Sequence, residues 1–272
     1  MELSSTTQRK LDKLTSFFKD KKRVLVAFSG GVDSSLVTMV AKIALRDDVM
    51  AVTVNSTLFP PLEIQNSKRI AEKIGVRHRI VDIDLLANSF IYNNPPNRCY
   101  YCKKEIITTL KKIAKDEGMS MIVDGTNTDD LKKYRPGALA LKEEGVYSPL
   151  AIIGVSKREV REIASYLGLP NYDKPSMTCF ASRFPYHQKI TREGVLRISE
   201  AENYIISLLG AKQVRVRDHN GIARIELGKD ERKLLYDEVL MDKIVRKLKS
   251  LGFNYITMDL QGYRSGSMDE VL

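Results

Sequence analysis

Residues 23–34 read Arg-Val-Leu-Val-Ala-Phe-Ser-Gly-Gly-Val-Asp-Ser, and this stretch decides how the rest of the chain is interpreted. The apolar run Arg23–Phe28 is typical of a strand that a parallel sheet buries on both faces. The turn Ser29–Ser34 leads into a helical pattern over Ser34–Arg46. Its two glycines accept positive φ and allow close approach to the backbone, while N–H groups at a helix start favour phosphate. We therefore expect a phosphate-binding turn; the alternative is a plain strand-to-helix turn with an Asp or Ser cap.

Strands and helices alternate over the first two-thirds of the chain. Further apolar runs lie at residues 50–54, 79–83 and 121–123, and helical patterns lie at 62–74, 105–118 and 156–167. This alternation predicts an α/β fold, in which helices cover both faces of a parallel, doubly wound sheet. Ligands of such sheets bind beyond the carboxyl ends of the strands, and the turn Ser29–Ser34 follows the first of them.

The pattern changes after a Pro-containing stretch at residues 170–185. Helical patterns then lie at 193–209 and 230–251, and strands at 213–217, 222–227 and 255–260, with Asn220-Gly221 as a hairpin signal. We expect two domains, 1–185 with the doubly wound sheet and 186–272 as a smaller C-terminal α+β domain. Alternation along its strands predicts one apolar face and one face with Arg215, Arg217 and Arg224. That charged face is either an anion site or a solvated surface with ion pairs.

Composition restricts the class of protein and its partners. The 272 residues include 44 Lys+Arg and 34 Asp+Glu, which gives a formal net charge of +10. This excess predicts an anionic partner, either a nucleic acid or a phosphorylated small molecule. No apolar run approaches the ~18 residues of a membrane span, and the basic N-terminus lacks a secretory pattern. We therefore expect a cytoplasmic protein that does not bind membranes, and its three cysteines argue against a disulfide framework.

The cysteines suggest a metal site. Cys99 and Cys102 form a Cys-x-x-Cys motif, and Cys179 follows in a second irregular segment. Three thiolates predict a metal with one open position: a 4Fe-4S cluster usually takes four cysteines, so three leave one iron free. Zinc with a fourth ligand is the competing metal, and His187 is the histidine near Cys179 in the sequence. A redox dithiol beside an unrelated buried cysteine is the third interpretation.

The turn Ser-Gly-Gly-x-Asp-Ser after a first strand resembles the PP-loop of the N-type ATP pyrophosphatases. The resemblance implies that a substrate oxygen attacks the α-phosphate of ATP, that pyrophosphate leaves, and that a nucleophile then displaces AMP. It also implies that Asn55-Ser56 and Gly125-Thr126-Asn127, after later strands, hold the adenosine. Asp129 and Asp130 either help to place Mg²⁺ or simply begin an exposed helix.

The whole chain resembles the LarE family, the ATP-dependent sulfur transferases of nickel-pincer nucleotide biosynthesis. The matching segments are residues 29–34, 98–103, 124–130, 135–137, 179–183, 214–217 and 262–267, in family order. The resemblance implies conversion of two carboxylates of a pyridinium mononucleotide to thiocarboxylates, for the cofactor of lactate racemase. Some members sacrifice the sulfur of one cysteine, which matches Cys179, whereas others hold a 4Fe-4S cluster on three. The three cysteines here favour the cluster type, with a hydrosulfide on the open iron as sulfur donor.

The resemblance also assigns roles to individual residues. Catalysis is expected from Asp33, Ser34 and Cys179, and the cluster from Cys99, Cys102 and Cys179. The ATP-binding residues that it implies are Ala27, Ser29, Gly30, Gly31, Val32, Asp33, Ser34, Ser56, Gly125 and Asn127. The implied substrate-binding residues are Arg98, Ser182, Arg183, Arg215, Arg217 and Arg264. ATP, Mg²⁺ and the cluster are the expected cofactors.

Two other functions are compatible with parts of the sequence. A tRNA-thiolating enzyme would share the PP-loop, the cysteines and the charge, but the chain lacks a second Cys-x-x-Cys and an obvious RNA-binding domain. A nucleotide-binding regulatory module without turnover is the other alternative. The expected partners are a nucleotide-like small molecule, sulfide or a sulfur-donor protein, and further copies of the chain as a homo-oligomer; a nucleic acid is not favoured.

Overall fold

The computed structural model describes residues 3–132, 136–174, 178–264 and 266–271, so Arg135 and Ser265 of the quoted motifs lie outside it. The chain forms two compact units. The N-terminal unit comprises Met1–Ser56, Pro61–Asp84 and Asn97–Met177, and the C-terminal unit comprises Thr57–Pro60, Leu85–Pro96 and Thr178–Leu272. Two short early segments therefore belong to the unit formed by the end of the chain. The division into domains 1–185 and 186–272 stays a prediction.

A four-stranded parallel sheet forms the centre of the N-terminal unit. Its strands are β1 Val24–Ala27, β2 Val49–Asn55, β3 Arg77–Asp82 and β4 Met121–Val123, in the order β3-β2-β1-β4. The chain moves outward from β1 through β2 to β3 and then returns to the other side of β1, where β4 pairs with it. The predicted doubly wound α/β fold is confirmed, and its topological switch point lies between β1 and β4.

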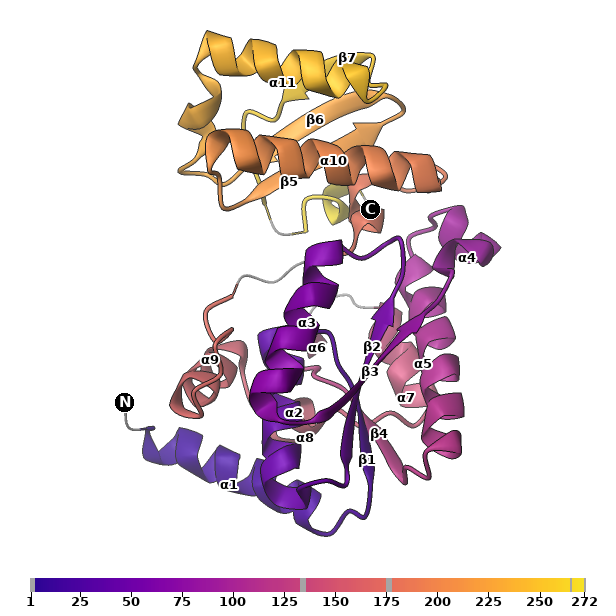
Figure 1. Cartoon of the computed structure of the whole chain (residues 1–272), viewed down its shortest axis with the longest axis vertical. Helices are drawn as coiled ribbons and strands as arrows, with labels where there is room; N and C mark the ends of the chain where they lie inside the picture. The colour runs from indigo at the N-terminus through magenta and orange to yellow at the C-terminus, as the bar shows by residue number, and fades with distance from the viewer. Residues whose placement is uncertain (1–2, 133–135, 175–177, 265, 272) are drawn as a thin grey trace. The chain divides into compact units, whose positions relative to one another are not determined.

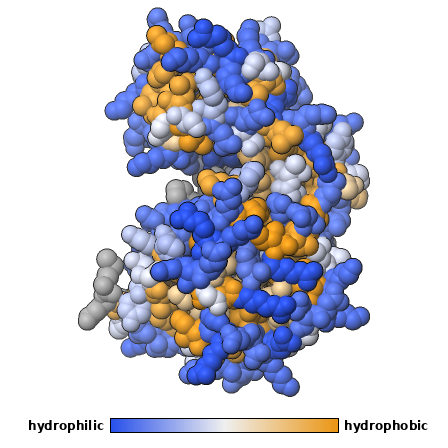
Figure 2. All heavy atoms as spheres, viewed as in Figure 1, coloured by the Kyte–Doolittle hydropathy of each residue, from blue (hydrophilic) through white to orange (hydrophobic). Residues whose placement is uncertain are grey.

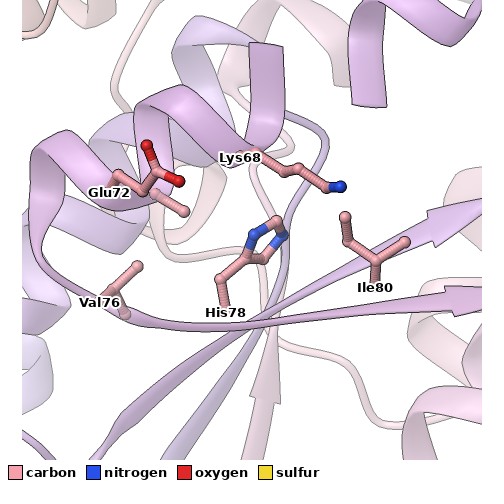
Figure 3. A pocket seen from close by; sticks show the side chains of 6 residues that line it. Lys68, Glu72, Val76, His78 and Ile80 are labelled. Carbon is pink, nitrogen blue, oxygen red and sulfur yellow. The ribbon is translucent and has the colours of Figure 1, made fainter. Parts of the chain in front are cut away.

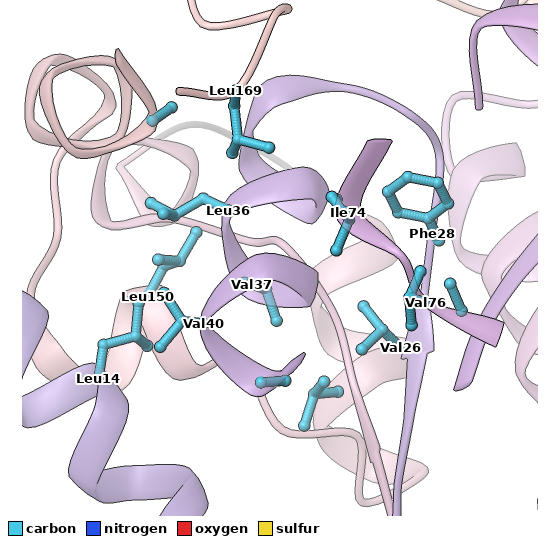
Figure 4. Packing of buried hydrophobic residues seen from close by; sticks show 14 of the residues in the cluster. Leu14, Val26, Phe28, Leu36, Val37, Val40, Ile74, Val76, Leu150 and Leu169 are labelled. Carbon is cyan, nitrogen blue, oxygen red and sulfur yellow. The ribbon is translucent and has the colours of Figure 1, made fainter. Parts of the chain in front are cut away.

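Helices cover both faces of this sheet (Figure 1). Neighbouring residues of β1 enter opposite cores, since Val24 and Val26 join one cluster and Leu25 joins the other. Helices α2 (Val32–Leu45) and α3 (Pro61–Ile74) form the first face, together with α1 Ser5–Lys19, α8 Pro149–Ile153 and α9 Lys157–Tyr166. Figure 4 shows Val37 and Val40 of α2 in this cluster. Helices α5 (Arg98–Asp116) and α7 (Pro136–Glu143) cover the opposite face.

The C-terminal unit is built on a three-stranded sheet. Strands β5 (Val214–His219) and β6 (Ile222–Leu227) are antiparallel, and β7 (Tyr255–Met258) runs parallel to β6. The hairpin loop is only Asn220 and Gly221, with φ values of 51° and 91°, as a two-residue turn with positive φ at both positions requires. Helices α10 (Arg192–Leu209) and α11 (Glu238–Ser250) pack on the apolar side of the sheet (Figure 1).

Several short elements complete the chain. One prediction was wrong: the helix expected at 230–251 begins at Glu238, because Asp237 caps it and a separate 3-10 turn precedes it. The remaining short elements are η1 Leu85–Ala87, α4 Ser89–Tyr92, α6 Thr128–Leu131, η2 Phe180–Arg183, η3 Arg232–Leu235 and η4 Asp269–Val271. Hydrophilic residues dominate the face seen in Figure 2. Within the described ranges, no helix has the length and apolar character needed to cross a bilayer.

Candidate ATP site and sulfur-transfer site

The turn after β1 lies at the switch point of the sheet. Strand β1 ends at Ala27, Gly31 is the N-cap of α2, and Val32, Asp33 and Ser34 form the first turn of that helix. The Ser34 hydroxyl donates to Gly31 O at 3.1 Å and accepts from Ser29 N at 3.2 Å. These two hydrogen bonds hold the turn in one conformation. The backbone N–H groups at the start of α2, which have no partner within the helix, are therefore held in fixed positions.

Two glycines permit close packing at this turn. Gly30 has φ +70°, and a Cβ there would lie 2.8 Å from the Cα of Ser67 in α3. A Cβ on Gly125, in the loop after β4, would lie 2.6 Å from the backbone N of Ser34. Because real Cβ contacts are never this short, a side chain at either position would displace backbone. Gly125 thus allows the loop after β4 to lie directly against the start of α2.

The Asp33 carboxylate is held from two directions. Asn127 Nδ2 donates to one oxygen at 3.0 Å, and Lys157 Nζ forms an ion pair with the other. Lys157 is the first residue of α9, whose N-cap Ser156 forms a capping box with Glu159. The start of this helix therefore places a cation beside the turn after β1. The signal in the sequence was a lysine at a helix start, which is too common to single out.

Asn171 is a second contact that the sequence did not reveal. Its side chain is buried, and Nδ2 donates to Gly30 O at 2.9 Å and to Ser35 Oγ at 3.0 Å. The donor fixes the direction of the Gly30 carbonyl, and with it the peptide plane between the two glycines. No spacing or composition in the segment after α9 points to this role.

The acidic residues after β4 serve the local backbone. Asp130 accepts from Asn127 N at 3.2 Å in a capping box, and Asp129 accepts from Lys157 N at 2.8 Å. Asp124 accepts from Thr126 Oγ1 and Ser148 Oγ, both at 2.6 Å. The capping box of Asp130 fits the helix-start interpretation, whereas Asp129 contacts the start of α9. Asp33 is the carboxylate of the turn itself, and its chemistry suits Mg²⁺ beside phosphate.

Cys99 lies in the first turn of α5, and Cys102 follows about one helical turn later. Cys99 is exposed and Cys102 is half-buried, whereas Arg98 beside them is buried. Lys104 of α5 contacts Glu143, the last residue of α7, at 2.9 Å and Glu144, which follows that helix, at 2.6 Å, and these contacts fix the helix that carries both thiols. Hydrogen bonds from Lys104 and Lys111 lower the pKa of Glu144 to about 2.

The third cysteine, Cys179, belongs to the C-terminal unit and is the N-cap of η2. In the part of the chain that the structure describes, no three His, Cys, Asp or Glu side chains gather to hold a metal ion. The N-terminal unit thus supplies two neighbouring thiols and the C-terminal unit supplies one. A three-thiolate group is not formed within either unit.

Arg183, at the end of η2, is completely buried and contacts the turn that contains Cys179. Its Nη1 donates to Thr178 Oγ1 at 2.7 Å, to Ser182 Oγ at 3.0 Å and to Cys179 O at 3.2 Å. Its other two nitrogens form a bidentate pair with Glu202 at 2.8 and 3.0 Å. In this structure the whole guanidinium is occupied by protein acceptors.

Arg217 on β5 is engaged in a similar way. Its Nε and Nη2 donate to the Glu226 carboxylate at 2.6 and 2.8 Å. Its Nη1 donates to Ser182 O at 2.6 Å, and Nη2 also donates to Ser267 Oγ at 3.0 Å. The Cys179 turn is therefore held by two arginines, each paired with a buried glutamate.

Arg215 differs from both. It is 5% exposed, donates to Val214 O at 2.7 Å and stacks on the Tyr263 ring, yet no carboxylate of the described residues forms an ion pair with it. Its Nε is buried without a hydrogen-bond partner. Burial, and next the charge of Arg183, lower the pKa of Arg215. A buried cation without a counter-ion is costly, so this side chain is suited to an anionic ligand.

The remaining predicted residues lie at more open positions. Arg264 donates to Glu270 at 3.0 and 3.2 Å, an exposed pair that a ligand can displace. Ser56 follows β2 and is buried, at the same edge of the sheet as the turn after β1. Ser182 lies in η2, three residues after Cys179.

A pocket of about 360 Å³ between α3 and β3 contains none of these residues (Figure 3). Lys68, Glu72 and His78 line it, and His78 Nε2 forms a 2.8 Å hydrogen bond with Thr53 Oγ1. Burial, and next the charge of Lys68, lower the pKa of His78. The pocket therefore contains neither the predicted ATP-binding residues nor the predicted substrate-binding residues.

Comparison with known proteins shows to which family the chain belongs. A family model described as NAD synthase matches residues 8–114, which contain the turn after β1. A pyridinium-3,5-bisthiocarboxylic acid mononucleotide synthase of Lactiplantibacillus plantarum is 41% identical over 269 residues, 98% of this chain and 96% of that protein. The chain belongs to the LarE family. It is thus an ATP-dependent sulfurtransferase with a PP-loop at residues 29–34.

Other relatives of this LarE-family chain include one that is named only as uncharacterized. That protein, from Synechocystis, is 43% identical over 97% of this chain and 98% of its own length. A tRNA-specific 2-thiouridylase of Rickettsia peacockii is 25% identical over 75% of this chain and 65% of that protein. The LarE-family match is therefore both closer and more complete than the match to a tRNA-modifying enzyme.

Proposed function

We propose that the chain adenylates the carboxylates of pyridinium-3,5-biscarboxylic acid mononucleotide and converts them to thiocarboxylates for nickel-pincer nucleotide synthesis. The observation that carries this proposal is the 41% identity, over 98% of the chain, with a synthase named for the bisthiocarboxylic acid product. The PP-loop at the switch point supports the ATP-dependent half of the reaction. The product would serve an enzyme of the lactate racemase kind, in the cytoplasm.

In the first step the PP-loop binds the phosphates of ATP, with Ala27, Ser56, Gly125 and Asn127 around the nucleotide. A carboxylate oxygen of the substrate attacks the α-phosphorus, the bond to the β-phosphate oxygen breaks, and pyrophosphate leaves. Asp33 would hold Mg²⁺, which neutralises phosphate charge when bound. Lys157 and the N–H groups at the start of α2 stabilise the departing pyrophosphate, and Ser34 donates its hydroxyl. The step makes a carboxylate reactive by giving it a good leaving group.

The substrate's phosphate and second carboxylate are bound by arginines of the C-terminal unit. Arg215 is the first candidate, because its buried charge has no carboxylate partner among the residues described. Arg264 joins it by exchanging the exposed carboxylate of Glu270 for the ligand. Ser182, Arg183 and Arg217 complete the site through the Cys179 turn, and Arg98 contributes from the start of α5.

In the second step sulfur attacks the acyl carbon of the adenylate. The new carbon–sulfur bond forms, the carbon–oxygen bond to AMP breaks, and AMP leaves with its electron pair. Cys99, Cys102 and Cys179 would hold a 4Fe-4S cluster, which when bound supplies a hydrosulfide on the iron that no cysteine ligates. The alternative donor is Cys179 itself, which would be left as dehydroalanine. Sulfide or a sulfur-donor protein would replenish the cluster, and the enzyme would act as a homo-oligomer.

Anaerobic reconstitution separates the two sulfur sources. The protein is loaded with iron and sulfide, given ATP and the biscarboxylic substrate, and analysed by mass spectrometry of both product and protein. The proposal expects iron-dependent thiocarboxylate formation over many turnovers with Cys179 intact. Product formed without iron, with loss of one sulfur from Cys179, would establish the sacrificial route instead. No thiocarboxylate under either condition would overturn the proposed function.

A tRNA-thiolating activity is the second candidate, favoured by the match to a tRNA-specific 2-thiouridylase and by the net charge of +10. It predicts a tRNA complex whose affinity falls steeply with salt. A gel shift with bulk tRNA at several salt concentrations tests it. The absence of a shift at low salt would reject it.

A further inference from the structure

We infer that Glu202 is a positioning residue that fixes the Cys179 turn and the arginine-bearing strand β5 in one arrangement. Glu202 lies in α10 and is 5% exposed. The inference rests on the proposed role of Cys179 in sulfur delivery, but its geometry stands on contacts within the C-terminal unit. It assigns Glu202, and through it Arg183, to the orientation of the reacting group rather than to contact with substrate.

The first arm of the network runs from Glu202 to the turn. Its carboxylate takes Nε and Nη2 of Arg183 in a bidentate pair, which directs Nη1 of that guanidinium toward the Cys179 turn. Nη1 then reaches both the side chain and the carbonyl of Thr178 and also the carbonyl of Cys179. These carbonyls belong to the peptide groups on either side of the Cys179 Cα. Hydrogen bonds to both carbonyls fix these two peptide groups, and they therefore determine the direction in which the Cys179 side chain points from the backbone.

The second arm runs from Glu202 to β5. Oε1 accepts from the backbone N of Val216 at 3.0 Å as well as from Arg183. Strand β5 is at the edge of its sheet and pairs only with β6, so the carboxylate satisfies an outward N–H group. Val216 lies between Arg215 and Arg217, whose side chains point to the opposite face. The Glu202 carboxylate therefore fixes the position of β5, the strand that carries Arg215, relative to the Cys179 turn.

Stability alone does not explain this arrangement. A buried ion pair is often no more stabilising than apolar residues of the same volume, because both charges lose their hydration. The bidentate geometry does, however, specify orientation, which an apolar pair would not. Arg183 and Glu202 form such a pair at 0% and 7% side-chain exposure, beside the predicted reactive thiol. Small displacements of a reacting group cost about a hundredfold in rate, so orientation is the property at stake.

The test is the alkylation rate of Cys179 in the full-length protein. In a Cys99→Ser, Cys102→Ser background, iodoacetamide labels only Cys179, and intact-protein mass spectrometry follows the rate. Glu202→Gln keeps the shape of the side chain but places an amide donor against the donors of Arg183. We expect about fivefold faster alkylation, because the turn opens locally more often. In the protein with all three cysteines, sulfur transfer should lose kcat by about tenfold or more, with KM for ATP unchanged.

Asp218→Asn is the matched control. Asp218 of β5 is buried and pairs with Arg197 of α10, so the variant breaks a similar helix-to-strand ion pair in the same unit. Neither residue has a hydrogen bond to residues 178–183 among the contacts of the described chain. We expect a comparable fall in melting temperature with unchanged alkylation of Cys179. An equal acceleration in both variants would mean general loosening and would overturn the inference.

Arg183→Lys is a second variant, which changes the partner of Glu202 and can be used if Glu202→Gln does not fold. Lysine keeps the charge but cannot serve Glu202 and three acceptors of the turn at once. Unchanged alkylation in folded Glu202→Gln or Arg183→Lys protein would disprove the positioning role. Because alkylation needs neither ATP nor sulfur transfer, this result is independent of the proposed function. Faster alkylation in a protein that transfers no sulfur would leave the network standing and remove only the function.

Discussion

Arg215 and Arg217 are two residues apart on one strand, yet among the described contacts Arg217 forms a carboxylate ion pair and Arg215 does not. Arg217 has a full complement of acceptors in Glu226, Ser182 and Ser267, whereas Arg215 has a backbone carbonyl and the face of Tyr263. The charge of Arg217 is therefore balanced by Glu226, whereas no carboxylate among the described residues forms an ion pair with Arg215. Retaining a buried cation without a counter-ion makes physical sense if a ligand supplies the anion.

Replacing each arginine by methionine should have opposite effects on stability. Arg215→Met removes an uncompensated buried charge and should leave the free energy of unfolding unchanged or higher, while raising KM for the anionic substrate about tenfold or more. Arg217→Met removes the bidentate partner of the buried Glu226, which keeps its 3.0 Å contact with Arg224, and should destabilise by up to about 3 kcal/mol. Urea denaturation and substrate kinetics measure both. A large loss of stability in Arg215→Met would show that its charge is compensated.

His78 should make stability depend on pH. Burial lowers its pKa below the ordinary value of 6.5, with Lys68 as a further cause and Glu72 of α3 opposing. The unfolded chain then binds a proton that the folded chain does not, so stability falls as pH drops below 6.5 toward the folded pKa. His78→Gln should show a smaller fall between about pH 7.5 and 5.5. Burial also lowers the pKa of His219, so the comparison variant His219→Gln should likewise show a smaller fall in stability over this pH range. Identical pH profiles for wild type and His78→Gln would contradict this assignment.

At the scale of elements, the PP-loop depends on parts of the chain that the loop sequence does not contain. Its glycines permit positive φ at Gly30, but glycines also make reversal of the peptide plane between them easy. Asn171, after α9, holds the Gly30 carbonyl, and Ser67 in α3 closes the space beside its Cα. A carbonyl turned toward phosphate would repel it, so this anchoring matters for binding.

Asn171→Ala should therefore weaken pyrophosphate and ATP binding. We expect about tenfold lower affinity for inorganic pyrophosphate, since one buried donor of the loop is lost. Titration calorimetry on the folded variant measures it. Asn94→Ala is the control, because Asn94 is an equally buried asparagine that donates to two backbone carbonyls in the C-terminal unit. Equal loss of affinity in both variants would point to instability instead of loop geometry.

The sequence predicted the long elements well, because their periodicity is local. The strands of the parallel sheet lie within a few residues of their predicted positions, and the Asn220-Gly221 hairpin forms. The helix expected from 105 begins earlier, at Arg98, and short helices such as α4 and α8 were not predicted because one or two turns carry no period. Contacts of Lys157 and Asn171 with the PP-loop join residues more than a hundred positions apart, which no local pattern encodes.

At the scale of the whole molecule, the three cysteines are divided between the two units. Their motifs predicted a common role, and the family match extends over both units, but the roles of the individual thiols stay predictions. A cluster requires all three thiolates, whereas a sacrificial mechanism requires only Cys179. The two routes therefore differ in how they respond to changes at α5.

Cys99→Ser, Cys102→Ser and Cys179→Ser variants should separate them. Under the cluster proposal each single change lowers the iron content of the protein, because the cluster needs its full ligand set. The rate of multiple-turnover sulfur transfer should fall about a hundredfold. Iron and acid-labile sulfide content of anaerobically purified protein, measured beside turnover, checks this. Full activity in Cys99→Ser and Cys102→Ser, with loss only in Cys179→Ser, would leave Cys179 as the direct donor.

The way the chain alternates between its units has a consequence during synthesis on the ribosome. Leu58 and Asn94 emerge early, yet they bind backbone at Phe180, Phe184 and Pro185. Domains usually fold as they emerge, N-terminal first. Here the segments after β2 and β3, Thr57–Pro60 and Leu85–Pro96, belong to the unit that Thr178–Leu272 completes. Their hydrogen-bond partners are therefore synthesised last. Until those residues emerge from the ribosome, the two segments lack the hydrogen-bond partners that they have in the folded C-terminal unit, so this unit can form only at the end of synthesis.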